Sequence, residues 1–415
     1  MYYMYQIQHL PLRIIPMTYK TLLLILVTLF TACSLNASDN KVYTGIDVLV
    51  AEDFKALNGS RAGLITNHTG LDRQGRSTIT LLLNAPNVSL IRLFSPEHGI
   101  EGKMDELVGD SSHQDTGMQV VSLYGETRKP PADTLKDIDT LIFDIQDIGT
   151  RFYTYISTMG HAMQAASEAG IRFVVLDRPN VINGMDVAGP VLDSGKESFV
   201  GFHTIAVRHG MTIGEIALMF RKEFGLDLDL EIIRMRGWKR TDYFEDTGLD
   251  WVNPSPNMRS PTQALIYPGL GLLETTNLSV GRGTTTPFEH FGAPWIRAEE
   301  LAAHLTDLDL PGVRFSAVHF TPDASKFAGE ACQGIRIQVT DRKTFDPLAM
   351  GLSIARQIRV DYPDDWDMSR FIRLLGNESV YEAISKGSPL DEIVRIYQPG
   401  LNSFIKRRAD FLIYP

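Results

Sequence analysis

Residues 140–155 read TLIFDIQDIGTRFYTY, and this stretch indicates most directly which fold the chain adopts. A nearly continuous apolar run, Thr140–Ile145, gives way to closely spaced polar residues and a glycine. Such a run suits a β-strand that is buried on both faces, as the strands of a parallel sheet are. Three further runs share this texture, namely Ala62–Thr66, Val88–Phe94 and Phe173–Leu176.

Helical patterns lie between and after these runs. Ile156–Gly170 repeats apolar residues at helical spacing and stops at a glycine. Thr212–Gly225 shows the same spacing, and Thr212 with Glu215 forms the T-x-x-E pattern of a capping box. The alternation of strands and helices predicts an α/β domain with right-handed crossovers.

A change of amino-acid composition near Asn253 predicts a second domain. Residues 251–271, WVNPSPNMRSPTQALIYPGLG, are rich in Pro, Gly and Asn, and we expect no regular element to persist through them. The predicted domains therefore span residues 43–252 and 253–415. The second reads as α/β or α+β, with a helix over Asp346–Ile358 and strand-like segments GIRIQVT and FLIYP.

The N-terminal residues predict export and a lipid anchor. The apolar run Leu22–Phe30 follows Lys20 and is much shorter than the roughly 20 residues that span a bilayer. Small residues then lead to Cys33, as in a bacterial lipobox whose thiol receives diacylglycerol. We expect residues 1–32 to be a lipoprotein signal peptide and 33–42 a tether, which predicts a periplasmic or outer-membrane-attached protein. An uncleaved membrane anchor is the alternative.

Composition narrows the choice of partner and chemistry. The formal net charge of −10 argues against a nucleic-acid partner, and it requires that a few placed arginines hold any anionic ligand. There are two cysteines, so a lipidated Cys33 leaves Cys332 without a disulfide partner. The sequence shows no H-E-x-x-H motif, no cysteine pair at zinc-ligand spacing, no G-x-S-x-G elbow and no nucleotide-binding glycine loop. Carboxylate chemistry remains, with amides and aromatic residues suited to sugars.

Polar residues follow all four predicted strands. The carboxyl ends of parallel strands lie on one edge of the sheet, where ligands bind. Loops after strands are polar in most proteins, but four such loops together favour a functional site. The residues concerned are Asn67, His68, Glu97, His98, Asp144, Gln146, Asp147, Arg151, Tyr153, Tyr155, Arg178 and Asn180.

Seven motifs, in this order, resemble a bacterial family of exo-β-N-acetylmuramidases: SPEHGIEG, DIQDIGTRFYTY, LDRPN, VRHGMTIGE, PSPNM, YPGLGLLETTN and GRGTTTPF. The resemblance covers about residues 42–415. It implies a Rossmann-like N-terminal catalytic domain, a smaller C-terminal domain and a cleft between them. It also implies release of N-acetylmuramic acid from the non-reducing end of peptidoglycan fragments, with no metal and no organic cofactor. The sequence departs from the family pattern at Phe371–Gly376, where relatives often carry an Asp after the Phe. This difference affects local packing more than activity.

Glycoside cleavage needs a proton donor at the leaving oxygen and a group that manages an oxocarbenium-like charge. Glu97 is the predicted acid because it follows a strand and Pro96; its alternative role is to cap a helix that starts there. Asp144, Asp147 and Glu274 are candidates for the second function, and Asp144 equally suits a buried structural pair. The acetamido group of the sugar can also attack, in which case one acid suffices.

Muramic acid carries a lactyl carboxylate, which an arginine can recognise through two parallel hydrogen bonds. Arg151, Arg178 and Arg282 are the candidates, and a structural ion pair is the alternative for each. Tyr153 and Tyr155 alternate along a segment expected to be extended, so they share a face that can pack on a sugar. The other predicted substrate-binding residues are His98 and His209, which can position hydroxyls or relay protons, and Asn277.

Two other classes of protein compete with the glycosidase. A non-catalytic lipoprotein that captures cell-wall fragments needs the arginine and the aromatic residues but not the acid. An amidase or esterase at the lactyl–peptide junction needs an activated serine, a cysteine or a metal, and no such motif occurs. The presence of Glu97 favours the enzyme.

Lipidation at Cys33 gives a first prediction. Replacing Cys33 by Ser removes the acceptor thiol, so the variant should partition into the aqueous phase, whereas the natural protein enters detergent. Metabolic labelling with a fatty acid checks this result. A natural protein that takes up no fatty acid would contradict the expectation.

Overall fold

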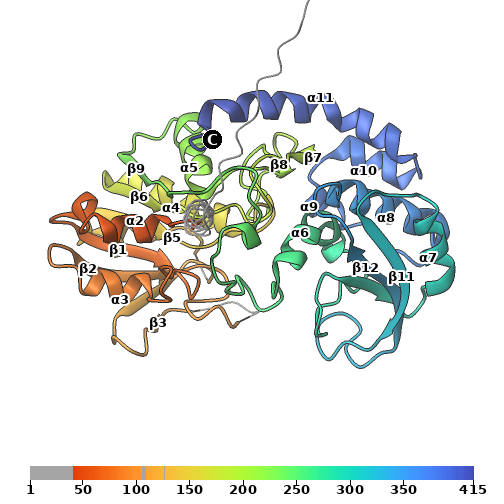
Figure 1. Ribbon diagram of the computed structural model, residues 1–415, viewed down its shortest axis with the longest axis horizontal. Coiled ribbons are helices and arrows are strands. Elements are labelled where there is room, and N and C mark those ends of the chain that lie inside the picture. The colour runs from red at the N-terminus through yellow and green to blue at the C-terminus, as the bar shows by residue number, and fades with distance from the viewer. Residues whose placement is uncertain (1–40, 105–108, 126) are drawn as a thin grey trace, which may run out of the picture. The chain divides into compact units, whose positions relative to one another are not determined.

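A seven-stranded sheet organises the first half of the chain in the computed structural model, which describes residues 41–104, 109–125 and 127–415 (Figure 1). The strand order is β3-β4-β2-β1-β5-β6-β9, and neighbouring strands are parallel except for the antiparallel pair β3–β4. The strands are β1 (Arg61–Thr66), β2 (Ser89–Ser95), β3 (Ser111–Ser112), β4 (Gln119–Ser122), β5 (Thr140–Asp144), β6 (Arg172–Leu176) and β9 (Leu230–Ile233).

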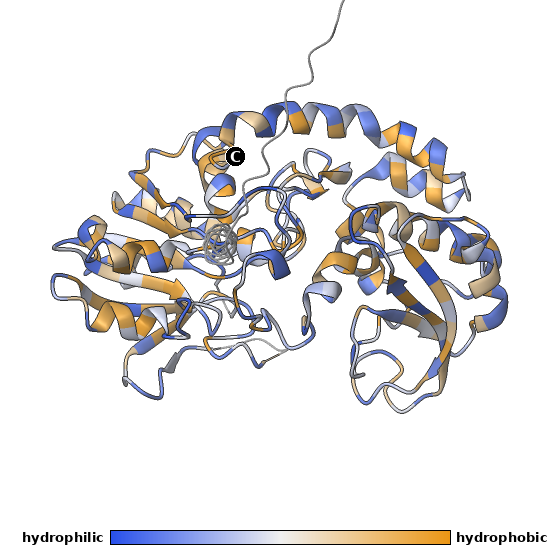
Figure 2. Ribbon diagram, viewed as in Figure 1, coloured by the Kyte–Doolittle hydropathy of each residue, from blue (hydrophilic) through white to orange (hydrophobic). Residues whose placement is uncertain are grey.

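The central strands are buried on both faces, as their apolar runs predict. Every residue of β5 is buried, and successive residues point to opposite sides of the sheet. Leu141 and Phe143 join one hydrophobic cluster, whereas Ile142 joins the other. The hydropathy colouring shows apolar residues concentrated on these strands and alternating with polar residues along surface helices (Figure 2).

Helices cover the two faces of the sheet. Helices α2 (Gly45–Ala51) and α3 (Thr78–Leu83) supply the cluster on one face. Helices α4 (Tyr155–Ala169) and α5 (Ile213–Glu223) supply the cluster on the other face. Each helix therefore buries an apolar stripe against alternate residues of the same strands.

Local sequence signals set the ends of α4 and α5. Gly170 ends α4 in the left-handed conformation, with φ of 63°, where a glycine avoids the steric cost of a β-carbon. Thr212 caps α5: its side chain accepts the Glu215 amide, and the Glu215 carboxylate accepts the Thr212 amide at 3.0 Å. The predicted capping box is confirmed, and α5 ends at Glu223.

The topology gives the sheet a switch point beside β1. The chain places β2 on one side of β1 and returns to place β5 on the other side. The loops that leave β1 and β5 therefore diverge at the carboxyl edge, and a crevice opens between them. Residues 67–69, 96–98 and 145–154 lie in the loops at this edge.

The C-terminal part contains a smaller antiparallel sheet of order β10-β12-β11. Helix α11 runs from the region of α10 past the β7–β8 pair, and the segment after it contacts α5 (Figure 1). The two-stranded sheet of the first part consists of β7 (Ala188–Val191) and β8 (Ala206–Arg208). The elements of the C-terminal part are α6 (Pro261–Leu270), β10 (His290–Ala293), α7 (Ala298–Thr306), β11 (Val313–Phe320), β12 (Cys332–Val339), α8 (Pro347–Asp361), α9 (Ile372–Leu375), α10 (Glu378–Ser385) and α11 (Leu390–Arg408).

Two local expectations were wrong. The proline-rich stretch 251–271 contains α6, because Pro261 occupies the first helical turn, where its missing amide is tolerated, and Ser260 caps the helix. Pro268 removes one hydrogen bond, but burial of nearly the whole helix outweighs that loss. The terminal FLIYP forms no strand: Ala409–Phe411 is a 3-10 turn, and Tyr414 is held by a hydrogen bond to Asp177 at 2.6 Å.

The α/β class and the two-part architecture agree with the sequence analysis. Residues 41–415 form one compact unit, and the boundary at residue 253 stays a prediction. Cys33 and the predicted signal peptide lie outside the described residues. Within those residues, no helix combines the length and apolarity that crossing a membrane requires.

The contact between α6 and α8 gives a second prediction. A β-carbon on Gly269 would lie 1.8 Å from the Pro347 carbonyl oxygen, so the helices approach closely only because no side chain intervenes. Gly269→Ala should lower the free energy of unfolding by about 1–3 kcal/mol, the usual cost of overpacking. Urea unfolding measures this change.

Gly400 on α11 is the matched control, because a β-carbon there meets no atom within 4 Å. Gly400→Ala should leave stability unchanged or raise it by up to about 1 kcal/mol through helix propensity. Equal effects of the two substitutions would contradict this account of the helix contact.

Candidate functional site

A cavity of about 330 Å³ brings residues of both parts of the chain together. One wall comes from the loop after β2 and the segment before α4, and the other comes from the segment after α6 and from α9. The lining residues are Glu97, His98, Tyr124, Phe152, Tyr153, Thr154, Tyr155, Val200, Ser255, Asn257, Met258, Tyr267, Glu274, Thr275, Arg282, Phe288, Arg373 and Leu374.

Glu97 is half-buried in this cavity, two residues after β2. Residues 97–102 form turns and not a helix, so Glu97 does not serve as a helix cap. Its carboxylate accepts a hydrogen bond from the Thr154 hydroxyl. Burial and a second hydrogen bond, to Glu97, raise the pKa of Tyr124 to about 12, so Tyr124 is a protonated donor at neutral pH. The carboxylate therefore faces the cavity between two hydroxyl groups.

His98 adopts a left-handed backbone, with φ of 70°, and its Nδ1 lies 2.6 Å from the Met104 carbonyl oxygen. Only a few per cent of residues other than glycine have a positive φ, and such strain often occurs at functional sites. The conformation turns the chain sharply right after Glu97 and directs the His98 ring to the cavity wall.

Tyr153 and Tyr155 form an aromatic wall. Their ring centroids lie 5.0 Å apart in an edge-to-face arrangement. The Tyr155 hydroxyl donates to the Pro254 carbonyl at 2.5 Å and accepts from Asn67 Nδ2 at 3.1 Å. The expectation of an extended segment was wrong, because Tyr155 is already the first residue of α4. The rings nevertheless line the same cavity.

Glu274 and Arg282 supply a charged pair on the opposite wall. Glu274 lies in the 3-10 turn Gly271–Thr275, and its Oε1 is 2.6 Å from Arg282 Nη1. The two side chains are only partly exposed, at 21% and 30% respectively, so the pair is shielded but open to the cavity. Lys326 donates from Nζ to the Glu274 carbonyl oxygen at 2.5 Å and secures the turn.

Asp144 and Arg178 pair below the sheet edge instead of lining this cavity. Arg178 Nε and Nη2 lie 2.6 and 2.9 Å from the two Asp144 carboxylate oxygens, and both side chains are buried. The Thr78 hydroxyl donates a further bond to Asp144. Since removing one partner of such a pair costs about 3–5 kcal/mol, we assign the pair a structural role.

The side chain of Arg151 also makes its hydrogen bonds inside the protein and not in the cavity. Its buried guanidinium donates to the carbonyls of Pro190 and Ile205 at 2.9 and 3.1 Å, and to those of Leu374 and Leu375 at 2.8 and 2.7 Å. Burial lowers the pKa of Arg151 to about 9. Of the three arginines proposed to read a lactyl group, only Arg282 lies in the cavity.

Asp147 and His209 form a buried pair that does not line the cavity. Asp147 Oδ2 lies 3.8 Å from His209 Nε2 and accepts the Gly149 amide at 2.7 Å. Burial raises the pKa of Asp147 to about 7 and lowers the pKa of His209 to about 3. Among the described residues, Asp147 Oδ1 and His209 Nε2 have no hydrogen-bond partner, and Asp147 lies near enough to Tyr153 to interact with it electrostatically.

The predicted polar residues outside the cavity mainly brace its loops. His68 Nε2 lies 2.6 Å from the Asn253 carbonyl oxygen. Gln146 and Asn180 donate to backbone carbonyls of Pro179 and Met211, and Asn277 donates to the carbonyl of Asp365. These contacts fix the loops around the site.

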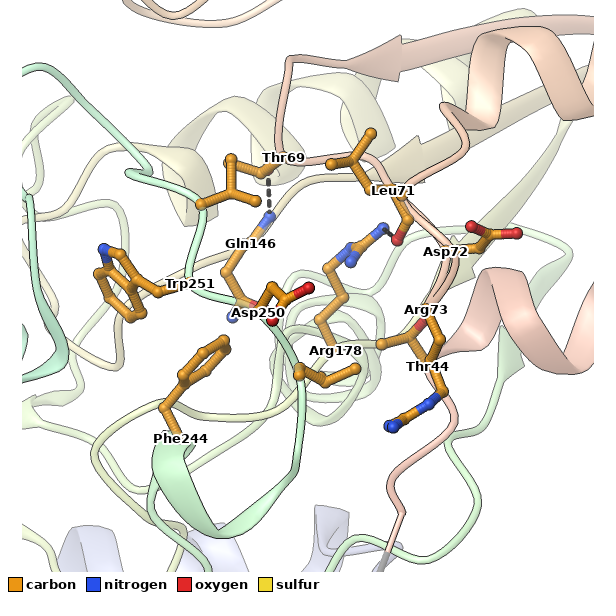
Figure 3. A pocket seen from close by; sticks show the side chains of 13 residues that line it. Thr44, Thr69, Leu71, Asp72, Arg73, Gln146, Arg178, Phe244, Asp250 and Trp251 are labelled. Atoms are coloured by element: carbon orange, nitrogen blue, oxygen red, sulfur yellow. Dashed lines mark hydrogen bonds between the residues drawn. The ribbon is translucent and has the colours of Figure 1, made fainter.

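A second cavity, of about 250 Å³, lies at the ends of β1, β5 and β6 (Figure 3). Arg178 extends into this cavity and donates to the Leu71 carbonyl at 3.0 Å. The backbone amide of Gln146 donates to the Thr69 hydroxyl at 3.0 Å. Phe244 and Trp251 supply an apolar side. The Arg178 and Gln146 side chains are both occupied by internal contacts, since Gln146 Nε2 donates to the carbonyls of Asp147 and Pro179. This favours the cavity around Glu97 as the reactive site.

Sequence reasoning missed several residues of the main cavity. Ser255, Asn257 and Met258 belong to the PSPNM motif, which could have indicated them. Tyr124 and Arg373 follow no motif that points to a ligand, and only the tertiary structure brings them to the cavity. Across the described ranges, no three His, Cys, Asp or Glu side chains cluster so as to hold a metal ion.

The N-terminal and C-terminal models of the family described as exo-beta-N-acetylmuramidase NamZ match residues 62–262 and 265–414. A Bacillus subtilis protein, peptidoglycan beta-N-acetylmuramidase NamZ, is 46% identical over 383 residues, which cover 91% of this chain and 92% of that protein.

Two crystal structures of DUF1343 family proteins from Bacteroides fragilis are also similar. The first has a TM-score of 0.85 and 40% sequence identity, and the second has a TM-score of 0.72 and 30% identity. Each alignment covers 90% of this chain and 99% of the other. The described fold is thus shared along nearly the full length of these proteins.

The buried Asp147 gives a third prediction. Its pKa in the folded protein, about 7, lies above the usual value of 3.8 for an aspartate, so the folded state binds this proton more tightly than the unfolded state. The stability contributed by the neutral form of Asp147 is therefore lost as the pH rises from about 4 to about 7. Asp147→Asn cannot ionise, and its free energy of unfolding relative to the natural protein should increase over that range in urea titrations.

His209 provides a control of opposite sign. Its pKa falls from 6.5 to about 3 on folding, so the unfolded state binds the proton more tightly and stability rises with pH between these values. His209→Gln should lose that rise and become less stable relative to the natural protein from pH 4 to pH 7. A pH-independent difference for Asp147→Asn would count against the buried, neutral acid.

Proposed function

Because the chain belongs to the exo-beta-N-acetylmuramidase NamZ family, we propose that it is a glycoside hydrolase that releases N-acetylmuramic acid from the non-reducing end of peptidoglycan fragments. The observation that carries this proposal is Glu97, a carboxyl group held between two hydroxyls in a cavity of about 330 Å³. Membership rests on matches over residues 62–262 and 265–414. The Bacillus subtilis relative bears the name of this activity.

Glu97 is the proposed general acid. In its protonated form it donates to the glycosidic oxygen, and the leaving sugar departs as an alcohol. Thr154 and Tyr124 then donate hydrogen bonds to the carboxylate that remains. Because these donors favour the ionised product, they assist proton transfer as the bond breaks.

Glu274 is the second carboxylate of the cavity, and its bond to Arg282 fixes its direction. It suits either of two tasks: it supports the positive charge that develops on the sugar ring, or it orients the acetamido group when that group attacks the anomeric carbon. Tyr153, Tyr155 and Tyr267 supply flat surfaces against which a sugar ring can pack.

A binding protein without catalysis explains this cavity less well. Capture of a saccharide needs the aromatic wall and a cation, but it does not need a carboxyl group held in place by two hydroxyls. The glycosidase accounts for both features. An amidase would need an activated nucleophile or a metal, and the sequence carries no motif typical of either.

Export and lipid attachment complete the proposal. The sequence pattern before Cys33 supports acylation, and a peptidoglycan substrate lies outside the cytoplasm. We propose that residues 33–40 tether the enzyme to a membrane near its substrate, in the periplasm or on the outer membrane. Lys41 and Val42, the last two residues of the predicted tether, belong to the compact unit instead, and Val42 is buried beside Met235 and Trp238.

Glu97 gives a fourth prediction. Glu97→Gln keeps size and hydrogen bonding but has no proton to donate, so turnover of a muramic-acid-terminated disaccharide should fall by at least about a hundredfold. An activated aryl glycoside needs little protonation and should lose much less. Steady-state kinetics on the two substrates, with a melting curve to verify folding, measure the difference.

Glu101→Gln is the matched control, because Glu101 belongs to the same loop but does not line the cavity. It should retain near-normal turnover on both substrates. Near-normal turnover of Glu97→Gln on the disaccharide would remove Glu97 from the mechanism. A large and equal loss on both substrates would instead assign it the role of nucleophile or acetamido-orienting group.

A further inference from the structure

Arg373 is a cation of the cavity that the sequence analysis did not select. It lies on α9 and is exposed. We propose that Arg373 binds the lactyl carboxylate of N-acetylmuramic acid and so determines which sugar the enzyme accepts; this inference rests on the proposed function.

The other arginines considered for this task already have partners. Arg151 donates to backbone carbonyls, and Arg178 is paired with Asp144. Arg282 lies in the cavity but is paired with Glu274 at 2.6 Å. Within residues 41–104, 109–125 and 127–415, the guanidinium of Arg373 makes no ion pair or hydrogen bond, and so it can accept an incoming anion without breaking an existing contact.

The wall that carries Arg373 is positively charged, although the whole chain has a net charge of −10. Burial first, and then the charges of Arg282 and Arg370, lower the pKa of Lys326, whereas Glu274 opposes the shift. Lys326, Arg282 and Arg370 therefore lie close together beside Glu274, and Asp367 lies next to Arg370. An anionic group of the substrate is drawn to this wall.

Glu97 lies on the wall that faces these cations, so the cationic wall and the acid bind different ends of the sugar and thereby orient it. The lactyl carboxylate goes to the cationic wall, and the glycosidic oxygen is left on the side of the acid. The muramic acid ring then lies between the tyrosines and α9. A guanidinium suits this task because its planar fork binds a carboxylate through two parallel hydrogen bonds.

The backbone under Arg373 is held rigidly. Arg151 donates to the carbonyls of Leu374 and Leu375 at the end of α9, and Thr275 donates to the Arg370 carbonyl at 2.8 Å before its start. Gly376 ends the helix with φ of 63°, and a β-carbon there would lie 2.4 Å from Leu192. A preorganised backbone reduces the entropy lost when the side chain binds its ligand.

The test compares two substrates that share a leaving group. One is the aryl β-glycoside of N-acetylmuramic acid, and the other is the same compound with its lactyl carboxylate converted to a methylamide. The natural protein should prefer the carboxylate. Arg373→Gln should lower kcat/KM for the carboxylate by at least about tenfold, mainly through KM, and should change the amide little, so the preference disappears.

Two variants separate a direct contact from a general loss of charge. Arg370→Gln removes the same charge from the same turn, but Arg370 does not line the cavity, so the preference should persist. Arg373→Lys keeps the charge without the fork and should restore part of the preference. Calorimetric titration with free N-acetylmuramic acid measures the same loss of affinity without any need for turnover.

The outcomes are distinct. If Arg373→Gln keeps the preference for the carboxylate substrate, the assignment to Arg373 is overturned. Loss of that preference in Arg370→Gln or Arg282→Gln would then show which arginine binds the lactyl group instead. If the natural protein cleaves neither glycoside, the proposed hydrolase fails, and the calorimetric titration still decides on Arg373. Melting curves confirm that each variant is folded.

Discussion

The buried guanidinium of Arg151 is the contact on which the geometry of the cavity depends. It follows β5 on the acid-bearing side, yet its side chain donates to carbonyls at the end of α9 on the opposite wall. It also bonds carbonyls of β7 and of the turn before β8. Burying an arginine without a carboxylate is costly, and four backbone acceptors offset that cost. The two walls are thus joined by one side chain.

The sheet explains why the acid lies at this point. The loop that leaves β2 and the loop that leaves β5 both open at the carboxyl edge, beside the switch in strand order at β1. The first loop carries Glu97, and the second carries Thr154 and leads into α4 at Tyr155. The scaffold therefore sets the positions of the acid and its hydrogen-bond donor, while the C-terminal part supplies the second carboxylate and the cations.

The central sheet and α5 could be predicted because their signals are local. Apolar runs identify buried strands, and Thr212 with Glu215 identifies a helix start. Helix α6 was not predicted, because the burial that outweighs its prolines arises only from tertiary packing. The C-terminal FLIYP has strand composition but finds no neighbouring strand to pair with.

The candidate site could be predicted only in part. Sequence places Glu97, Glu274 and Arg282 in motifs, and the structure places all three in one cavity. The sequence cannot reveal whether an arginine faces carbonyls or solvent, and so it selected the buried Arg151 and did not select the exposed Arg373. The most direct test of the account is to incubate the purified protein with two disaccharides, one ending in N-acetylmuramic acid and one in N-acetylglucosamine at the non-reducing end. Release of N-acetylmuramic acid from the first, with the second left intact, is the predicted result; failure to cleave the first, or equal cleavage of both, would contradict it.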